Sequence, residues 1–166
     1  MRRALPALLA LATALAGCGS GGGPLELVSA DPPAGATAAG KRAERQGGND
    51  PDAGERIYEL SPPEGSALTY TVTVRNPTDE VVSVTGVAAD EDRDGAFVPE
   101  RVDGGPVQVP AGGRSAVTVE GTVKGCDYGT QQVPLAGPEL VLETDGGSST
   151  QEFDLGIQVL LKVKGC

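Results

Sequence analysis

The sequence contains no His and no Trp, and Met1 is its only Met. His is the side chain that enzymes use most often for general acid–base catalysis. No GxSxG nucleophile motif and no recognisable Ser–Lys motif takes its place. Copper carriers depend on Met and His ligands, so this composition also excludes that class of protein. We therefore expect that the protein is not an enzyme.

Basic residues are also scarce. The chain has 13 Lys and Arg against 23 Asp and Glu, which gives a formal net charge of −10 at pH 7. Nucleic acids and anionic lipid headgroups both attract Lys and Arg, so a surface of this charge repels them. The balance predicts no binding to nucleic acid and no polybasic membrane anchor.

Only one long apolar run is present, at residues 4–16, and it follows Met1-Arg2-Arg3. A basic start, a short apolar segment and small residues after it are the parts of a secretory signal. The run of about 13 residues is shorter than the ~20 that a membrane-spanning helix needs. We therefore interpret residues 1–17 as a signal peptide that is removed.

The run ends in Leu15-Ala16-Gly17-Cys18, which resembles the lipobox of bacterial lipoproteins. The resemblance implies that the peptide bond before Cys18 is cut and that the Cys18 thiol carries diacylglycerol. Two fatty chains are enough for stable anchoring. The implied location is therefore the extracytoplasmic face of the cell membrane, with the membrane as a partner through the lipid. The alternatives are an ordinary secretory signal that happens to contain Cys18, or a buried N-terminal helix.

Removal of 17 of the 166 residues leaves 149, enough for one domain and a tether. Residues 18–54 are rich in Gly, Ala and Pro, which favours a lipidated tether. Within it, a short apolar patch at residues 24–29 predicts a first edge strand. The 25 residues 30–54, as a random coil, would span about 27 Å.

Residues 55–166 predict the folded domain, since apolar residues there alternate with Thr and charged residues. The alternation has the period of half-buried strands, and Gly, Pro and Asp separate the segments as turns. The aromatic residues Tyr70 and Phe153 are expected in the core. The predicted strands cover 68–75, 81–88, 95–98, 106–109, 117–124, 140–142 and 153–163.

About seven short alternating strands over this length favour an all-β, immunoglobulin-like antiparallel β-sandwich. The stretch Leu68–Glu80, LTYTVTVRNPTDE, resembles the second-strand region of bacterial immunoglobulin-like and fibronectin-III-like modules. A jelly roll and an open barrel are the alternative architectures.

Besides Cys18, the chain has Cys126 and Cys166, an even pair in an exported protein. We predict that they form a disulfide. The bridge would close a loop of about 40 residues and stabilise the domain by roughly 4 kcal/mol. Metal-binding or redox thiols are the alternative, which the absence of Cys-x-x-Cys spacing disfavours.

Carboxylates at Asp90, Asp92 and Asp94 precede Gly95. This spacing can wrap a calcium ion in oxygen ligands. An EF-hand would also need Glu at the twelfth position, where this chain has Arg101. The alternative is a solvated acidic loop between two strands, without a cofactor.

These observations together predict a lipid-anchored cell-envelope protein with a non-enzymatic binding or structural-accessory role. The expected partner is an envelope protein whose identity the sequence does not give. A calcium-binding adhesion or spacer module is one alternative function, and an envelope enzyme is another.

Overall fold

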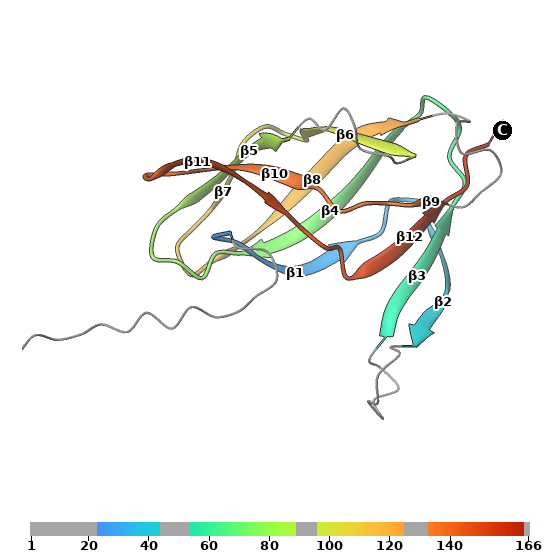
Figure 1. Ribbon diagram of the computed structural model, residues 1–166, viewed down its shortest axis with the longest axis horizontal. Helices are drawn as coiled ribbons and strands as arrows, with labels where there is room; N and C mark the ends of the chain where they lie inside the picture. The colour runs from blue at the N-terminus through green and yellow to red at the C-terminus, as the bar shows by residue number, and fades with distance from the viewer. Residues whose placement is uncertain (1–22, 44–53, 89–95, 125–132, 165–166) are drawn as a thin grey trace, which may run out of the picture.

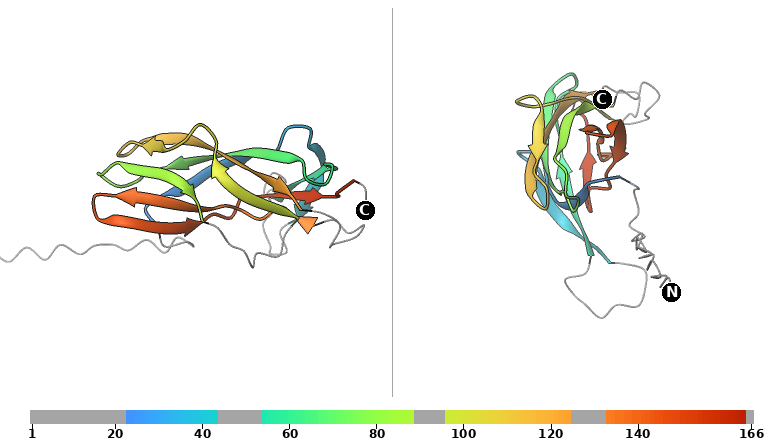
Figure 2. Two further views of the ribbon diagram at one scale, coloured as in Figure 1. Left: turned by 90° about the horizontal axis from the view of Figure 1, so that it is seen from above. Right: turned by 90° about the vertical axis from the view of Figure 1, so that its left-hand side faces the viewer.

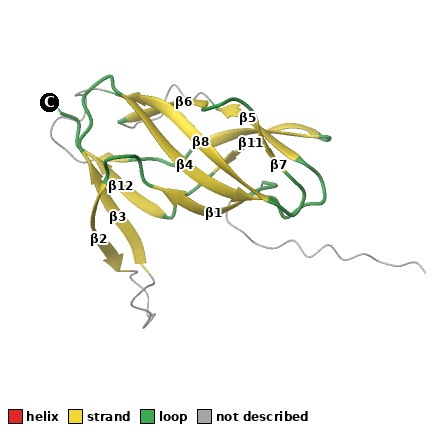
Figure 3. Ribbon diagram, turned by 180° about the vertical axis from the view of Figure 1, so that it is seen from behind, coloured by secondary structure: helices red, strands yellow, loops and turns green. Residues whose placement is uncertain are grey.

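The computed structural model describes residues 23–43, 54–88, 96–124 and 133–164. Twelve strands and no helix lie in these segments, and Figure 3 shows strands joined by loops and turns. Every strand pair is antiparallel except β3 with β12. The expectation of an all-β fold with an antiparallel β-sandwich is confirmed.

The first sheet has the strand order β1-β4-β8-β6. Its central pair, β4 and β8, stays in register over nine residue pairs without a bulge. The bounds are β1 Glu26–Asp31, β4 Ala67–Arg75, β8 Arg114–Val123 and β6 Phe97–Val102.

The second sheet has the order β11-β10-β5-β7 and covers the first (Figure 1). Its bounds are β11 Gly147–Glu152, β10 Glu139–Thr144, β5 Val82–Val87 and β7 Val107–Val109.

The core lies between these two sheets, because alternate residues of each strand point inward. The rings of Tyr70 and Phe97 meet edge to face, with centroids 5.8 Å apart. Gly121 is buried at the point where β8 passes Phe97, and a Cβ there would collide with the carbonyl oxygen of Val98. Eight fully buried side chains come equally from the two sheets: Val72, Val74, Val117, Val119, Val82, Val84, Leu140 and Leu142.

A third sheet, of order β2-β3-β12-β9, continues the molecule beyond one end of the sandwich (Figures 1 and 2). Val159 and Leu161 of β12 are fully buried and join the common core. The bounds are β2 Thr37–Ala43, β3 Gly54–Leu60, β12 Ile157–Leu161 and β9 Val133–Pro134.

The structure differs from the expected tether at residues 18–54, because β1 and β2 both lie inside that range. β1 pairs with β4 as the predicted first edge strand and also includes Ala30 and Asp31. β2 pairs with β3 from Thr37 to Ala43. Edge strands need few apolar side chains, so a low apolar content did not distinguish them from a loop. The folded part therefore begins before residue 30.

The segment 153–163 was predicted as one long strand, and the structure divides it. β11 ends at Glu152, β12 begins at Ile157, and Gly156 between them has a φ of +63°. The carboxylate of Asp154 accepts the Gly156 N–H (3.2 Å) and holds this turn. Phe153 is nevertheless buried as expected. The chain keeps its alternation while it passes from the second sheet to the third.

Candidate functional site

The site residues that the sequence singled out lie outside the described residues. These are Cys18, Asp90, Asp92, Asp94, Cys126 and Cys166. In the described segments, no group of three or more His, Cys, Asp and Glu side chains could hold a metal ion. No helix there is long and apolar enough to cross a membrane.

Both ends of the acidic segment 89–95 are held by backbone hydrogen bonds. The N–H of Ala88 donates to the C=O of Glu139 (2.8 Å) in the second sheet. The C=O of Ala96 accepts the N–H of Lys124 (2.9 Å) in the first. The acidic segment therefore joins β5 of one sheet to β6 of the other.

The two segments that lead to Cys126 and Cys166 both leave from the loop 62–66. Val123 exchanges two backbone hydrogen bonds with this loop, both 2.9 Å long. The N–H of Lys164 donates to the same loop (2.8 Å). Cys126 follows Val123 by three residues, and Cys166 follows Lys164 by two.

At the start of the described chain, Gln151 binds the backbone of Leu25. Its side-chain oxygen accepts the Leu25 N–H (3.2 Å), and its side-chain nitrogen donates to the Leu25 C=O (2.6 Å). Gln151 is 7% exposed and Leu25 is 3% exposed. A side chain on Gly23 would collide with the Gln151 amide. This contact, which we name the Gln151 clip, fixes the chain to β11 at a point seven residues after Cys18.

Asn76 is the other buried amide, and its role is structural. Its nitrogen donates to the C=O of Glu80 (2.6 Å) and of Val109 (3.1 Å). Its oxygen accepts the N–H (3.0 Å) and the hydroxyl (2.6 Å) of Thr78. An Asn side chain offers two donors and one acceptor oxygen with two lone pairs, so these four bonds use its whole capacity. Asn76 therefore holds the turn after β4, and its side chain is not available to a ligand.

β11 forms one edge of the second sheet. Among the described residues, β11 pairs with β10 alone. Phe153 donates its N–H to the C=O of Pro138 (3.0 Å), so the residues Phe153 and Pro138 form a hydrogen-bonded pair of this ladder. Hydrogen-bonded and non-hydrogen-bonded pairs alternate along two antiparallel strands. Ser148 and Thr150 therefore belong to non-hydrogen-bonded pairs and direct their N–H and C=O groups away from β10. We name these groups the β11 edge.

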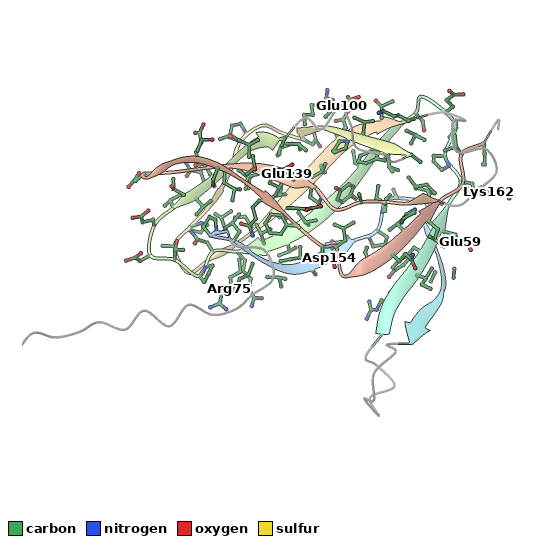
Figure 4. The ribbon with its side chains drawn as sticks, in the orientation of Figure 1. Glu59, Arg75, Glu100, Glu139, Asp154 and Lys162 are labelled. Atoms are coloured by element: carbon green, nitrogen blue, oxygen red, sulfur yellow. The ribbon has the colours of Figure 1, made fainter. Side chains whose placement is uncertain are left out.

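Charge on the second sheet is of one sign. Its four strands contain Glu139, Glu143 and Glu152 but no Lys or Arg. Asp145 in the β10–β11 turn and Asp154 after β11 add two more carboxylates. Figure 4 labels Glu139 on β10 and Asp154 just beyond the end of β11. The backbone of the β11 edge therefore lies beside a negatively charged surface.

The sequence did not predict the β11 edge or the Gln151 clip. β11 reads GSSTQE, which has no alternating apolar residues, and only Gln151 of the strand is buried. A turn at Asp145-Gly146 precedes β11, and a polar segment directly after an Asp-Gly turn is a signal for the second strand of a hairpin.

Comparisons with known proteins give no family for this chain. No family model matches it, and no curated protein matches it. One similar solved structure is that of the Vibrio cholerae VesB protease, at 15% sequence identity and a TM-score of 0.35. The match covers 65% of this chain and 30% of that one. A likeness this slight carries no argument about fold or activity.

Proposed function

We propose that this protein is a lipid-anchored cell-envelope protein whose β-sandwich has a non-enzymatic binding role at the extracytoplasmic face of the membrane. The observation that carries the proposal is the sequence Leu15-Ala16-Gly17-Cys18 directly after a short apolar run. Lipid on Cys18 supplies two fatty chains, which anchor a protein without a membrane-spanning helix.

The Gln151 clip supports a short distance between lipid and domain. Leu25 is already buried in the sandwich, and six residues separate it from Cys18. Seven peptide steps reach at most about 25 Å. The sandwich therefore stays close to the bilayer instead of being carried away by a long tether. The end of β11 that holds Leu25 is the part nearest to the lipid.

A disulfide between Cys126 and Cys166 is part of the same proposal, because an exported domain folds in an oxidising compartment. The shared loop 62–66 supports it, since both cysteine segments start there. The bridge would fasten the last strand, β12, to the end of β8. Peptide mapping without reductant should recover the two cysteines in one linked peptide, and two free thiols would remove this part of the proposal.

The test of the anchor is expression of the full chain in a bacterium that processes lipoproteins, followed by detergent phase partition and mass spectrometry. We expect the wild type in the detergent phase, with diacylglycerol on an N-terminal Cys18. The Cys18→Ser variant should move to the aqueous phase. The control Ser20→Ala leaves the lipobox intact and should partition as the wild type does. A wild-type protein in the aqueous phase with a bare Cys18 would contradict the anchor.

The spacing of Asp90, Asp92 and Asp94 before Gly95 favours a second candidate, a calcium-dependent spacer or adhesion module. Thermal unfolding with and without millimolar calcium separates the two functions. The binding role without a cation predicts equal melting temperatures. A rise in calcium that Asp92→Ala abolishes would identify the calcium-dependent module instead.

A further inference from the structure

We propose that the β11 edge is a docking site for an extended segment of a partner protein that carries Lys or Arg side chains. The inference deepens the binding role proposed above and rests on it for the location of the partner, whereas strand pairing at the β11 edge does not require the lipid. In this mode the partner adds a strand to the second sheet next to β11.

The first argument compares the six strands that end the three sheets. A free strand edge invites pairing with other chains, and proteins protect such edges with bulges, Pro, charge or short length. Register shifts interrupt β1, β2 and β6, and β6 also contains Pro99. β7 has three residues, and β9 has two, one of which is Pro134. β11 has six residues, a continuous register with β10, and no Pro or Lys.

The second argument is the geometry of the β11 edge. Ser148 and Thr150 present two N–H and two C=O groups away from β10, and both residues are exposed. The C=O of Glu139 points to the opposite side of β10, where it accepts the Ala88 N–H (2.8 Å). Glu139 therefore belongs to a non-hydrogen-bonded pair with β11, as the bond between Phe153 and Pro138 requires. An added strand would therefore find donors and acceptors at the spacing of an ordinary antiparallel or parallel ladder.

Charge identifies the partner. Ser148 lies opposite Glu143 across the ladder, and Thr150 lies opposite Val141, so these side chains share the outer face of the sheet. The strands of this sheet carry three Glu and no Lys or Arg. Side chains of an added strand on the same face would lie beside these carboxylates, and opposite charges across a sheet stabilise strand pairing. Acidic segments would be repelled, which gives the site its selectivity.

The position of the edge suggests where the partner is met. Gln151, which binds Leu25, is the residue next to Thr150. With the anchor at Cys18, the β11 edge is held beside the bilayer. A basic extended segment of an envelope protein close to the membrane surface fits both constraints.

The test uses the full chain with Cys18→Ser, so that lipidation cannot influence the result. The probes are a ten-residue peptide of alternating Val and Lys and a matched peptide with Glu in place of Lys. Binding is measured by titration, and the bound site by hydrogen exchange of backbone amides. We expect the Lys peptide to protect the amides of Ser148 and Thr150, and we expect the Glu peptide not to bind. Added salt should weaken the binding, because the carboxylates are exposed.

Thr150→Pro removes one N–H from the β11 edge without removing a bond to β10. A proline in this position is compatible with an edge strand, so the fold should persist, as circular dichroism can verify. We expect affinity for the Lys peptide to fall about tenfold, since a backbone bond is lost. Thr150→Val keeps the N–H and should bind as the wild type does. If Thr150→Pro does not fold, Ser148→Pro makes the same test, because it removes the other N–H of the β11 edge.

A charge pair completes the design. Glu143→Lys should weaken binding of the Lys peptide, whereas Glu100→Lys, which makes the same charge change on β6 of the first sheet, should not. Protection at β1 or β2 instead of β11, or full affinity in folded Thr150→Pro, would overturn the proposal. Association of the chain with itself through β11 would also overturn it, in favour of a second copy as the occupant. A bare Cys18 in the native protein would contradict the anchor and leave this test unchanged.

Discussion

Both sheets of the sandwich contribute side chains to the core, but the two sheets differ in their edges and in their charges. In the first sheet the register shifts along both edge strands, and the charges are of both signs and form two ion pairs: Arg75 with Glu26 (3.7 Å) and Arg101 with Glu120 (2.5 Å). The strands of the second sheet contain only acidic charges, and β11 has a regular edge.

This difference suggests that one sheet serves mainly the stability of the domain and the other mainly contact with a partner. A sheet with interrupted edge strands and charges of both signs gives an added strand little to pair with. A sheet with an unprotected edge and charge of one sign is less stable, but a partner can add a strand to that edge. We infer that the first sheet is the structural half of the domain and that the second is its contact half. The following variants test that division.

The largest expected effect comes from Gly121 in the first sheet, and Gly86 in the second sheet provides its comparison. A Cβ at Gly121, on β8 of the first sheet, would meet the carbonyl oxygen of Val98 and lie 2.6 Å from the ring of Phe97. Gly121→Ala should lower the free energy of unfolding by about 3 kcal/mol, because the backbone must move. Gly86, on β5 of the second sheet, has open space at its Cβ. Gly86→Ala should raise stability by about 0.5 kcal/mol. Urea unfolding measures both, and equal effects would contradict the division.

Asn76→Ala should have the next largest effect, because it breaks four hydrogen bonds, three to Thr78 and Glu80 in the turn after β4 and one to Val109 of β7. A buried polar group without its partner costs about 1–3 kcal/mol. The loss should appear as a lower urea midpoint with an unchanged slope. Thr78→Val removes only the hydroxyl of this network and serves as the milder control. If Asn76→Ala lowers the free energy of unfolding no more than Thr78→Val does, the Asn76 amide does not stabilise the turn after β4.

Gln151→Ala should cost about 1 kcal/mol overall, since two hydrogen bonds to Leu25 are lost. The effect is local, so hydrogen exchange at the amide of Leu25 should accelerate while exchange in β4 and β8 stays slow. The exposed neighbour gives a control, Thr150→Val, which leaves the Gln151 clip intact. Unchanged exchange at Leu25 in Gln151→Ala would contradict the clip as the point where the chain is fixed.

The smallest effect is expected at the ion pairs of the first sheet. Arg101 is 62% exposed and Glu120 is 21% exposed on their side chains. Exposed pairs contribute about 0–1 kcal/mol, so Arg101→Ala should be close to neutral. A double-mutant cycle with Glu120→Ala measures the pair directly. A coupling above about 1 kcal/mol would mean that the outer face of the first sheet contributes more to stability than its exposure suggests.

The sequence predicted the central strands well, because their inner residues alternate without interruption. Val72 and Val117 lie opposite each other in register and are fully buried, as period-two alternation requires. The edge strands were harder to predict. β11 buries only Gln151, and residues 37–40 of β2 are exposed, so hydrophobic alternation carries little information about these segments.

The candidate site shows the same limit. The β11 edge depends on which strand ends the sheet, a property of topology that no local segment contains. The Gln151 clip joins residues 126 positions apart in the sequence. By contrast, lipidation of Cys18, the bridge between Cys126 and Cys166 and the acidic loop at residues 90–95 depend on local motifs. They remain predictions, because these residues lie outside the described segments.

The most direct test of the account is energy transfer between the domain and the membrane. The lipidated full chain would be placed in vesicles that contain an acceptor dye on the lipid headgroups. A fluorescent amino acid would replace Thr150 beside the Gln151 clip or, as the control, Lys164, which follows β12 of the third sheet. The third sheet lies beyond the end of the sandwich opposite to the β10–β11 turn (Figure 1). The account predicts strong transfer from position 150, weaker transfer from position 164, and none in the Cys18→Ser variant. Equal transfer from both positions, or none from either, would contradict a sandwich held close to the bilayer by β11.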